Sequence, residues 1–229
     1  KGLTMQNSLL QMNLDARISG IITRTIDLPF RFYMLDDPSD ADFRHPAFLP
    51  IWDNGTNEIF GIWVASVSPL SFAYVRSVRE ESTIELVATT AEQFIAWIAV
   101  YAVDIGESRE PVTKFLTACS AQVGFDEIES VSCGDRDFSR LLPYRDGTLN
   151  PEHPPLLNEP RENARELFYS AVQERDVEAA WKLLNVSGWW DIDELKLAFD
   201  ALLREFPNLR SNEPIHKSWL ASIDAYLAL

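Results

Sequence analysis

The residues that most often carry chemistry are sparse and widely separated in this chain. The three histidines, His45, His153 and His216, lie far apart, and two of them precede prolines in predicted loops. Such spacing indicates neither a zinc site nor a general base beside a nucleophile. The motifs of zinc proteases, serine hydrolases, phosphate-binding loops and dinucleotide-binding domains do not occur. We therefore predict that the protein is not an enzyme and holds no metal and no cofactor.

Carboxylates are the abundant titratable groups. A glycosidase-type carboxylate pair brought together from distant segments stays an open alternative. The densest group of carboxylates surrounds Pro38 and consists of Asp36, Asp37, Asp40 and Asp42. These residues lack the glycine and the distal glutamate of a calcium-binding loop. We therefore predict that they form a solvated acidic loop.

The charge balance limits the classes of partner. The chain has 35 acidic and 20 basic residues, a formal charge of −15, which repels the phosphates of nucleic acids and anionic membrane surfaces. The same charge steers a basic protein towards the surface. A basic protein partner is therefore favoured, while the alternative is that the acidity only keeps the protein soluble.

Apolar runs and cysteines indicate the compartment. The longest apolar runs, such as Phe94–Val103, have about ten residues, roughly half of what a membrane-spanning helix needs. The first residues lack the apolar core and cleavage site of a secretory signal. Cys119 and Cys133 are too few for a disulfide framework. We expect a cytoplasmic protein with free thiols.

A β-hairpin is the clearest structural signal. The apolar runs Phe48–Trp52 and Ile59–Val64 flank the polar stretch Asp53–Glu58. Within it, Asn54 and Gly55 form the pair most typical of a tight hairpin turn, because both tolerate positive φ. Two strands joined at Asn54–Gly55 are therefore predicted.

Further strands and a covering helix are expected around this hairpin. Alternating or β-branched residues predict strands over Phe30–Leu35, Ser71–Ser77 and Leu86–Ala88. Thr89 and Thr90 can cap a helix over Ala91–Val103, with Glu92 and Gln93 near the positions of a capping box. Phe94, Trp97, Ile98 and Tyr101 form a stripe on that helix. The stripe predicts packing on a sheet, with a binding face as the alternative.

The stretch Leu28–Tyr101 resembles the SUKH superfamily, which includes the yeast cell-wall synthesis regulator and bacterial immunity proteins that neutralise toxins. The resemblance rests on FLPIWDNGTNEIFGIWV, on the apolar strand Phe72–Val75 and on VATTAEQFIAWI. It implies an α+β domain with one strongly curved antiparallel sheet and covering helices. It also implies a non-catalytic module that binds a protein partner.

The remaining segments are predicted to be mostly helical. Periodic apolar residues indicate an N-terminal helix within Leu9–Thr25 that ends near Gly20. Pro111–Val123 is predicted as a helix stopped by Gly124, and Phe125–Asn158 as an irregular connection rich in turn residues. Further helices are predicted over Asn158–Leu184, with a polar break at Arg175–Asp176, and over Asp191–Phe206 and Ile215–Leu227. Residues 1–150 are therefore expected to form the α+β domain, and residues 151–229 a small helical domain.

Together these observations lead to a functional hypothesis. The protein is expected to be an immunity protein that neutralises a basic toxin by occluding it; the alternative is a scaffold or regulatory adaptor. Trp189, beside Trp190 at a helix boundary, is a candidate interface anchor, the alternative being that it caps the helical core. The predicted partner-binding residues are Asp36, Asp37, Asp40, Asp42, Asp53, Asn54, Glu58 and Trp189.

Overall fold

The computed structural model describes most of the chain and confirms the α+β class. The described residues are 12–34, 45–78, 83–133, 136–147, 149, 151, 163–185 and 192–211. Five antiparallel strands form one sheet in chain order, a simple meander. They are β1 (Tyr33–Met34), β2 (Phe48–Asp53), β3 (Glu58–Val67), β4 (Leu70–Val78) and β5 (Thr83–Ala88).

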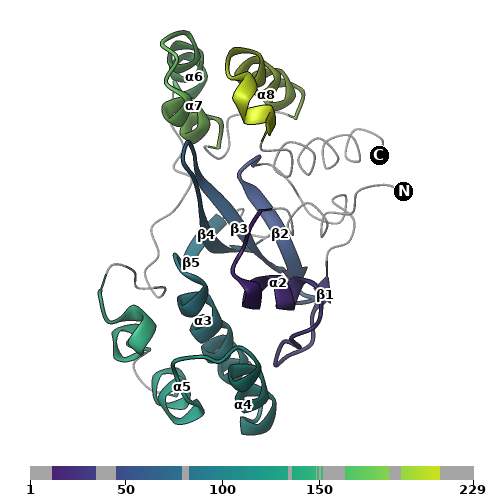
Figure 1. The fold of residues 1–229 in the computed structure, drawn as a ribbon, viewed down its shortest axis with the longest axis vertical. Helices are drawn as coiled ribbons and strands as arrows, with labels where there is room; N and C mark the ends of the chain where they lie inside the picture. Colours follow the sequence, from purple (N-terminus) through teal and green to yellow (C-terminus); the bar gives the residue numbers. More distant parts are fainter. Residues whose placement is uncertain are drawn as a thin grey trace.

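The sheet is strongly twisted, as expected for a curved sheet (Figure 1). The pairing register shifts between Pro50 and Trp52, between Val64 and Ser66, and between Tyr74 and Val75. Each shift is a bulge-like irregularity, and such irregularities bend a strand and increase its local twist. At Gly61 a side chain would meet the backbone of Leu49 on the paired strand, so the close approach of β2 and β3 requires glycine there.

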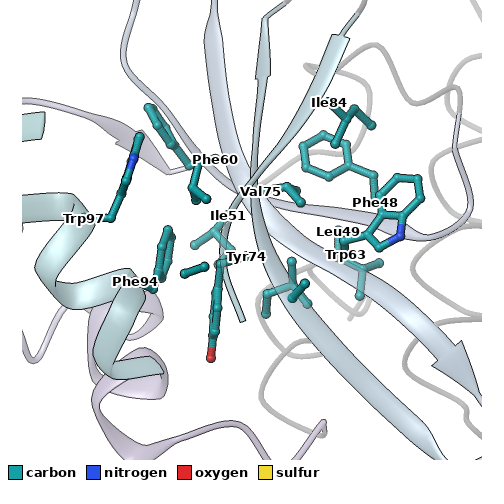
Figure 2. Close-up of a cluster of buried hydrophobic side chains, with 14 of the residues drawn as sticks. Phe48, Leu49, Ile51, Phe60, Trp63, Tyr74, Val75, Ile84, Phe94 and Trp97 are labelled. Carbon is teal, nitrogen blue, oxygen red and sulfur yellow. The ribbon is translucent and has the colours of Figure 1, made fainter. Parts of the chain in front are cut away.

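Helix α3 (Ala91–Asp104) covers one face of the sheet. The predicted capping box is present: the Thr90 side chain accepts from the Gln93 amide, and the Gln93 side chain accepts from the Thr90 amide. Figure 2 shows Phe94 and Trp97 of this helix facing Phe60 and Tyr74 of the sheet. The ring centroids of Tyr74 and Phe94 are 4.4 Å apart, and those of Phe60 and Trp97 are 5.4 Å apart. The predicted aromatic stripe is therefore core.

The N-terminal helix is α2 (Ala16–Ile22), and it continues past the predicted stop at Gly20. Gly20 is buried within it, and the two isoleucines that follow complete its apolar face. The Asp15 side chain caps the helix by accepting from the Arg17 amide at 2.9 Å. The Arg17 guanidinium forms a bidentate pair with Asp15 and also reaches Glu92 at the start of α3. An ion pair thus ties α2 to α3.

The region after α3 corrects two of the predictions. Helix α4 (Arg109–Ala118) ends before the predicted stop at Gly124, because Ser120 adopts positive φ. Gly124 instead begins a further helix, α5 (Phe125–Ser132), in a stretch predicted to be irregular. Its three buried apolar residues, Phe125, Ile128 and Val131, recur at every third position. Short 3₁₀ turns follow at Phe138–Arg140 and Leu142–Tyr144.

The C-terminal half is helical, as predicted. The stretch predicted as Asn158–Leu184 contains α6 (Ala164–Gln173) and α7 (Val177–Leu184), separated at the polar break, where Arg175 has positive φ. Helix α8 (Ile192–Glu205) and a 3₁₀ turn at Pro207–Ser211 follow. The helix predicted over Ile215–Leu227 lies outside the described residues. Among the described helices, none has the length and apolar character to cross a bilayer.

The molecule is elongated, with the sheet between two groups of helices (Figure 1). Helices α3, α4 and α5 lie towards one end, and helices α6, α7 and α8 lie at the other. One extensive hydrophobic core includes residues from the sheet and from both groups. The predicted boundary between residues 150 and 151 stays a prediction.

Helix α7 and its C-cap residue, Asn185, are fastened to the sheet by hydrogen bonds, some of them buried, from side chains to backbone groups. The Trp181 indole N–H donates to the carbonyl oxygen of Val64 at 2.9 Å, where the register of β3 shifts. The Glu178 carboxylate accepts from the amides of Val67 and Ser68, at 3.0 and 2.6 Å. The Asn185 side chain accepts from the Ala47 amide at 2.8 Å. These bonds satisfy backbone groups at the far end of the β2–β3 pair.

Two tryptophans offer a matched test of this attachment. Trp181 and Trp52 are both buried, but among the described residues the Trp52 indole N–H has no hydrogen-bond partner. Trp181→Phe should therefore lower the free energy of unfolding by about 1–3 kcal/mol more than Trp52→Phe, because only Trp181→Phe leaves a buried carbonyl without its donor. Urea unfolding followed by circular dichroism measures both; equal losses would contradict the proposed importance of the Trp181 bond.

Candidate functional site

The candidate site is the turn between β2 and β3, residues Asp53–Glu58, which we name the hairpin tip. Side chains hold this turn. The Asp53 carboxylate accepts from the Gly55 amide at 2.6 Å. The Asn54 side-chain oxygen accepts from the amides of Thr56 and Glu58, at 3.0 and 3.2 Å. The Asn54 amide donates to the Glu58 carbonyl at 3.1 Å, so several hydrogen bonds fix the backbone of the tip.

Gly55 occupies the point of the tip at which a side chain is least tolerated. Its φ is +82°, in the region that side chains with a Cβ rarely adopt. A Cβ at Gly55 would lie 2.6 Å from Cε2 of Tyr33. The Tyr33 ring therefore rests against the glycine, although 67% of that residue is exposed to solvent.

A polar network beneath the tip connects it to the rest of the fold. Glu58 forms an ion pair with Arg76 of β4 at 3.0 Å, and Arg76 also pairs with Glu85 of β5. The other Glu58 oxygen accepts from the Tyr101 hydroxyl at 2.7 Å and from the Asn54 side-chain amide at 2.6 Å. The tip is thereby joined to two further strands and to the last turns of α3.

Electrostatics within this network follow from its partial burial. Burial raises the pKa of Tyr101 to about 12, helped by the Glu58 carboxylate and opposed by the hydrogen bond from Asn54. Burial acts to lower the pKa of Arg76, but the hydrogen bond and charge of Glu85 outweigh it, so this pKa lies above its usual value. Near neutral pH the hydroxyl is therefore a hydrogen-bond donor and the guanidinium a cation.

The structure brings three of the predicted partner-binding residues together at the tip. Asp53 is buried, with 7% of the residue exposed, whereas Asn54 and Glu58 are half-buried. All three hold the turn by hydrogen bonds. The remaining predicted residues lie outside the described part of the chain: Asp36, Asp37, Asp40, Asp42 and Trp189. Recognition of a partner by these eight residues stays a prediction.

Sequence reasoning missed the other members of the site. Arg76 and Glu85 face one another because β4 and β5 pair in that register, and the sequence contains no signal for the register itself. Tyr101 was assigned to the covering stripe, and its hydroxyl reaches the tip only because α3 lies across the sheet. The alternating pattern of residues 30–35 predicted that Tyr33 lies in a strand. It gave no indication that the Tyr33 ring contacts Gly55.

Other reactive side chains in the described part of the chain do not gather into a second site. No group of three or more His, Cys, Asp or Glu residues there could hold a metal ion. Both cysteines are free, Cys119 buried and Cys133 exposed. Burial raises the pKa of Cys119 to about 12, so the thiolate, which is the nucleophilic form, is disfavoured. His45 is buried beside Trp63.

Comparison with known proteins does not identify a family for this chain. No protein-family model matches the chain, and no curated protein or solved structure matches it either. The resemblance to the SUKH superfamily therefore stays a prediction.

Gly55 provides a test of the tip geometry, with Gly106 as its matched control. Both have positive φ, but nothing lies within 4 Å of a Cβ built at Gly106. Gly55→Ala and Gly106→Ala should each cost about 1–2 kcal/mol of stability from backbone strain. Only Gly55→Ala should also displace the Tyr33 ring. Urea unfolding measures the loss of stability in each variant. Nuclear Overhauser effects between the Tyr33 ring and residue 55 report whether the ring moves. If these effects are the same in Gly55→Ala as in the unsubstituted protein, the contact between the Tyr33 ring and Gly55 is wrong.

Proposed function

We propose that this protein is a non-catalytic, cytoplasmic protein-binding module, and specifically an immunity protein that neutralises a cognate basic toxin by occlusion. The observation that carries the proposal is the hairpin tip, a polar surface turn fixed by side-chain hydrogen bonds in a chain with a formal charge of −15. The resemblance of the surrounding strands to the SUKH superfamily adds to it.

The fixed tip supports binding because a preorganised surface loses little conformational freedom when it docks. The Asn54 side chain alone makes contacts with Thr56, Glu58 and Tyr101. The turn therefore does not have to order itself around a partner. This is the property expected of a recognition surface, and it requires no chemistry from the residues involved.

The acidic balance supports a basic partner. Opposite charges on two proteins raise the rate at which they meet and orient them before contact. Occlusion of a cationic active site by an acidic surface needs only this complementarity and a well-packed contact. The same charge disfavours nucleic acid as the partner.

A second candidate function, a scaffold or regulatory adaptor, is favoured by a different observation. Large apolar side chains are exposed on the C-terminal helices: Leu167 and Tyr169 on α6 are 38% and 43% exposed, and Leu197 on α8 is 66% exposed. An adaptor could use these helices for one partner and the sheet for another. Its apolar contacts would weaken little with added salt.

Co-expression tests the immunity proposal directly. If the reading frame beside this gene encodes a toxin, cells expressing that toxin should survive when this protein is co-expressed, and the two purified proteins should form a complex. The counts of surviving colonies and size-exclusion chromatography measure these outcomes. No rescue, together with no complex, would refute the immunity function and leave the adaptor as the stronger candidate.

The predicted acidic loop can be tested by charge reversal. The triple variant Asp36→Lys, Asp37→Lys, Asp40→Lys should lower the association rate with the toxin by about tenfold or more at low salt, because steering is lost. A matched control with the same change in net charge is Glu110→Lys, Glu129→Lys, Glu166→Lys, at exposed positions on α4, α5 and α6. Stopped-flow kinetics at low and high salt compare the two. Equal rates for the variant and the control would remove the loop from the interface.

A further inference from the structure

The hairpin tip contains the one Asn-Gly pair of the sequence, Asn54-Gly55. Asparagine followed by glycine is the dipeptide most prone to spontaneous deamidation, because glycine has no side chain to shield its own backbone nitrogen from the preceding side-chain amide. Glycine also restricts the neighbouring backbone least, so the nitrogen and the amide carbon can approach each other. The pair is therefore a candidate modification site within the candidate binding surface.

Deamidation of this pair needs no cofactor and no reagent other than water. The backbone nitrogen of Gly55, after giving its proton to a base in solution, attacks Cγ of Asn54 and forms a new C–N bond. The bond from Cγ to Nδ2 breaks, and Nδ2 takes up a proton and leaves as ammonia, so that a cyclic succinimide remains. Water then adds to one of the two ring carbonyls, and the ring opens to aspartate or isoaspartate.

In the folded tip the group under attack, the Asn54 side-chain amide, is held at both of its ends. Its oxygen accepts from the Thr56 amide at 3.0 Å, from the Thr56 hydroxyl at 2.8 Å and from the Glu58 amide at 3.2 Å. Its nitrogen donates to the Glu58 carboxylate at 2.6 Å and to the Tyr101 hydroxyl at 3.0 Å. Attack requires Cγ to move from non-bonded to bonded distance of the Gly55 nitrogen, and this movement pulls both ends away from their partners.

The attacking group is held as well. The Gly55 amide donates its proton to the Asp53 carboxylate at 2.6 Å, so the proton that must leave before attack is shared with an anion. A nitrogen anion beside that carboxylate would be repelled by it, and the hydrogen bond between them would be lost. The bonds that fix the tip therefore stabilise both reacting groups in their unreactive form.

We propose that Asn54 is a modification site, which deamidates to aspartate and isoaspartate when the hairpin tip opens and is protected while the tip is closed. Asp53 and Glu58 are the protecting groups, the first on the attacking nitrogen and the second on the amide under attack. The inference goes beyond the proposed function and does not depend on it, since the modification is detected without a partner.

The modification also changes the tip. An aspartate at position 54 has no N–H to donate to Glu58 or Tyr101, and its second oxygen would stand where Nδ2 now lies 2.6 Å from a Glu58 carboxylate oxygen. Two carboxylates at that distance repel each other. Isoaspartate in addition lengthens the backbone of the turn by one carbon. Deamidation thus breaks a contact that delays it, and the change is irreversible because ammonia leaves.

The first test compares the full chain with a synthetic peptide of residues 52–59 with blocked ends, both incubated near neutral pH. Protease digestion at mildly acidic pH and mass spectrometry follow the replacement of the Asn54 amide by a carboxylate, and fragmentation distinguishes it from the same change at Asn57. Asn54 should deamidate at least about tenfold more slowly in the folded chain than in the peptide, because a hydrogen bond to a charged group must break first. An equal or faster rate in the folded chain, or no reaction in the peptide, would overturn the proposal.

Two carboxylates offer a matched pair of variants. Glu58 and Glu85 both pair with Arg76, but Glu58 also accepts from Asn54. Glu58→Ala should therefore accelerate deamidation of Asn54 in the full chain by about tenfold or more, whereas Glu85→Ala should leave the rate close to that of the unsubstituted protein. Equal rates in the two variants would overturn the protecting role of Glu58.

Circular dichroism checks that each variant is folded, since an unfolded chain would deamidate at the rate of the peptide. If Glu58→Ala fails this check, Thr56→Val replaces it: Thr56 is exposed, and the substitution removes its hydroxyl bond to Asn54 while its backbone bond remains. The rate should then rise about two- to tenfold above that of the unsubstituted protein. An unchanged rate would overturn the protection of Asn54 by the tip.

The effect of the modification on the tip has its own test. Asn54→Asp and Asn57→Asp add the same charge to the same turn, but it is Asn54 whose side chain donates to Glu58 and Tyr101. Asn54→Asp should therefore lower the free energy of unfolding more than Asn57→Asp does. Urea unfolding near neutral pH measures both variants, and equal losses would overturn the conclusion that deamidation loosens the tip.

Discussion

The packing of Phe94 between Trp52 and Tyr74 is the contact from which the other features of the structure follow. Its ring centroid lies 5.6 Å from that of Trp52 and 4.4 Å from that of Tyr74, and the residue has no exposed surface. Because these two partners belong to β2 and β4, one side chain of α3 spans the middle of the sheet. A helix is stiff, so fixing this point and its neighbour Trp97 fixes the position of both helix ends.

Each end of α3 then holds a different part of the molecule. At the first turn, Glu92 accepts from Arg17 of α2 and from the backbone amide of Gln122 after α4. Near the last turn, the Tyr101 hydroxyl donates to Glu58 at 2.7 Å. The hairpin tip therefore depends on core packing as well as on its own hydrogen bonds. A turn anchored to the core in this way keeps a fixed shape although it lies at the surface, and such a shape is preorganised for binding.

The sequence predicted the elements whose signals are local. The turn at Asn54–Gly55, the capping of α3 and the apolar stripes of α3, α6, α7 and α8 all depend on residues within a few positions of one another. The errors occurred where a local signal has two meanings. Gly124 is equally suited to follow one helix or to precede another, and only the burial of Phe125 with its neighbours in the core decides that it precedes α5.

The sequence by itself determined that a polar, glycine-containing turn joins two apolar strands in a strongly acidic chain, because turn chemistry, strand periodicity and net charge are properties of neighbouring residues or of composition. Only the tertiary structure decided that Asp53 is buried, that Glu58 is paired with Arg76, and that Tyr33 lies exposed against Gly55. These relationships depend on strand register and on where α3 crosses the sheet. Both are set by the packing of side chains that are far apart in the chain.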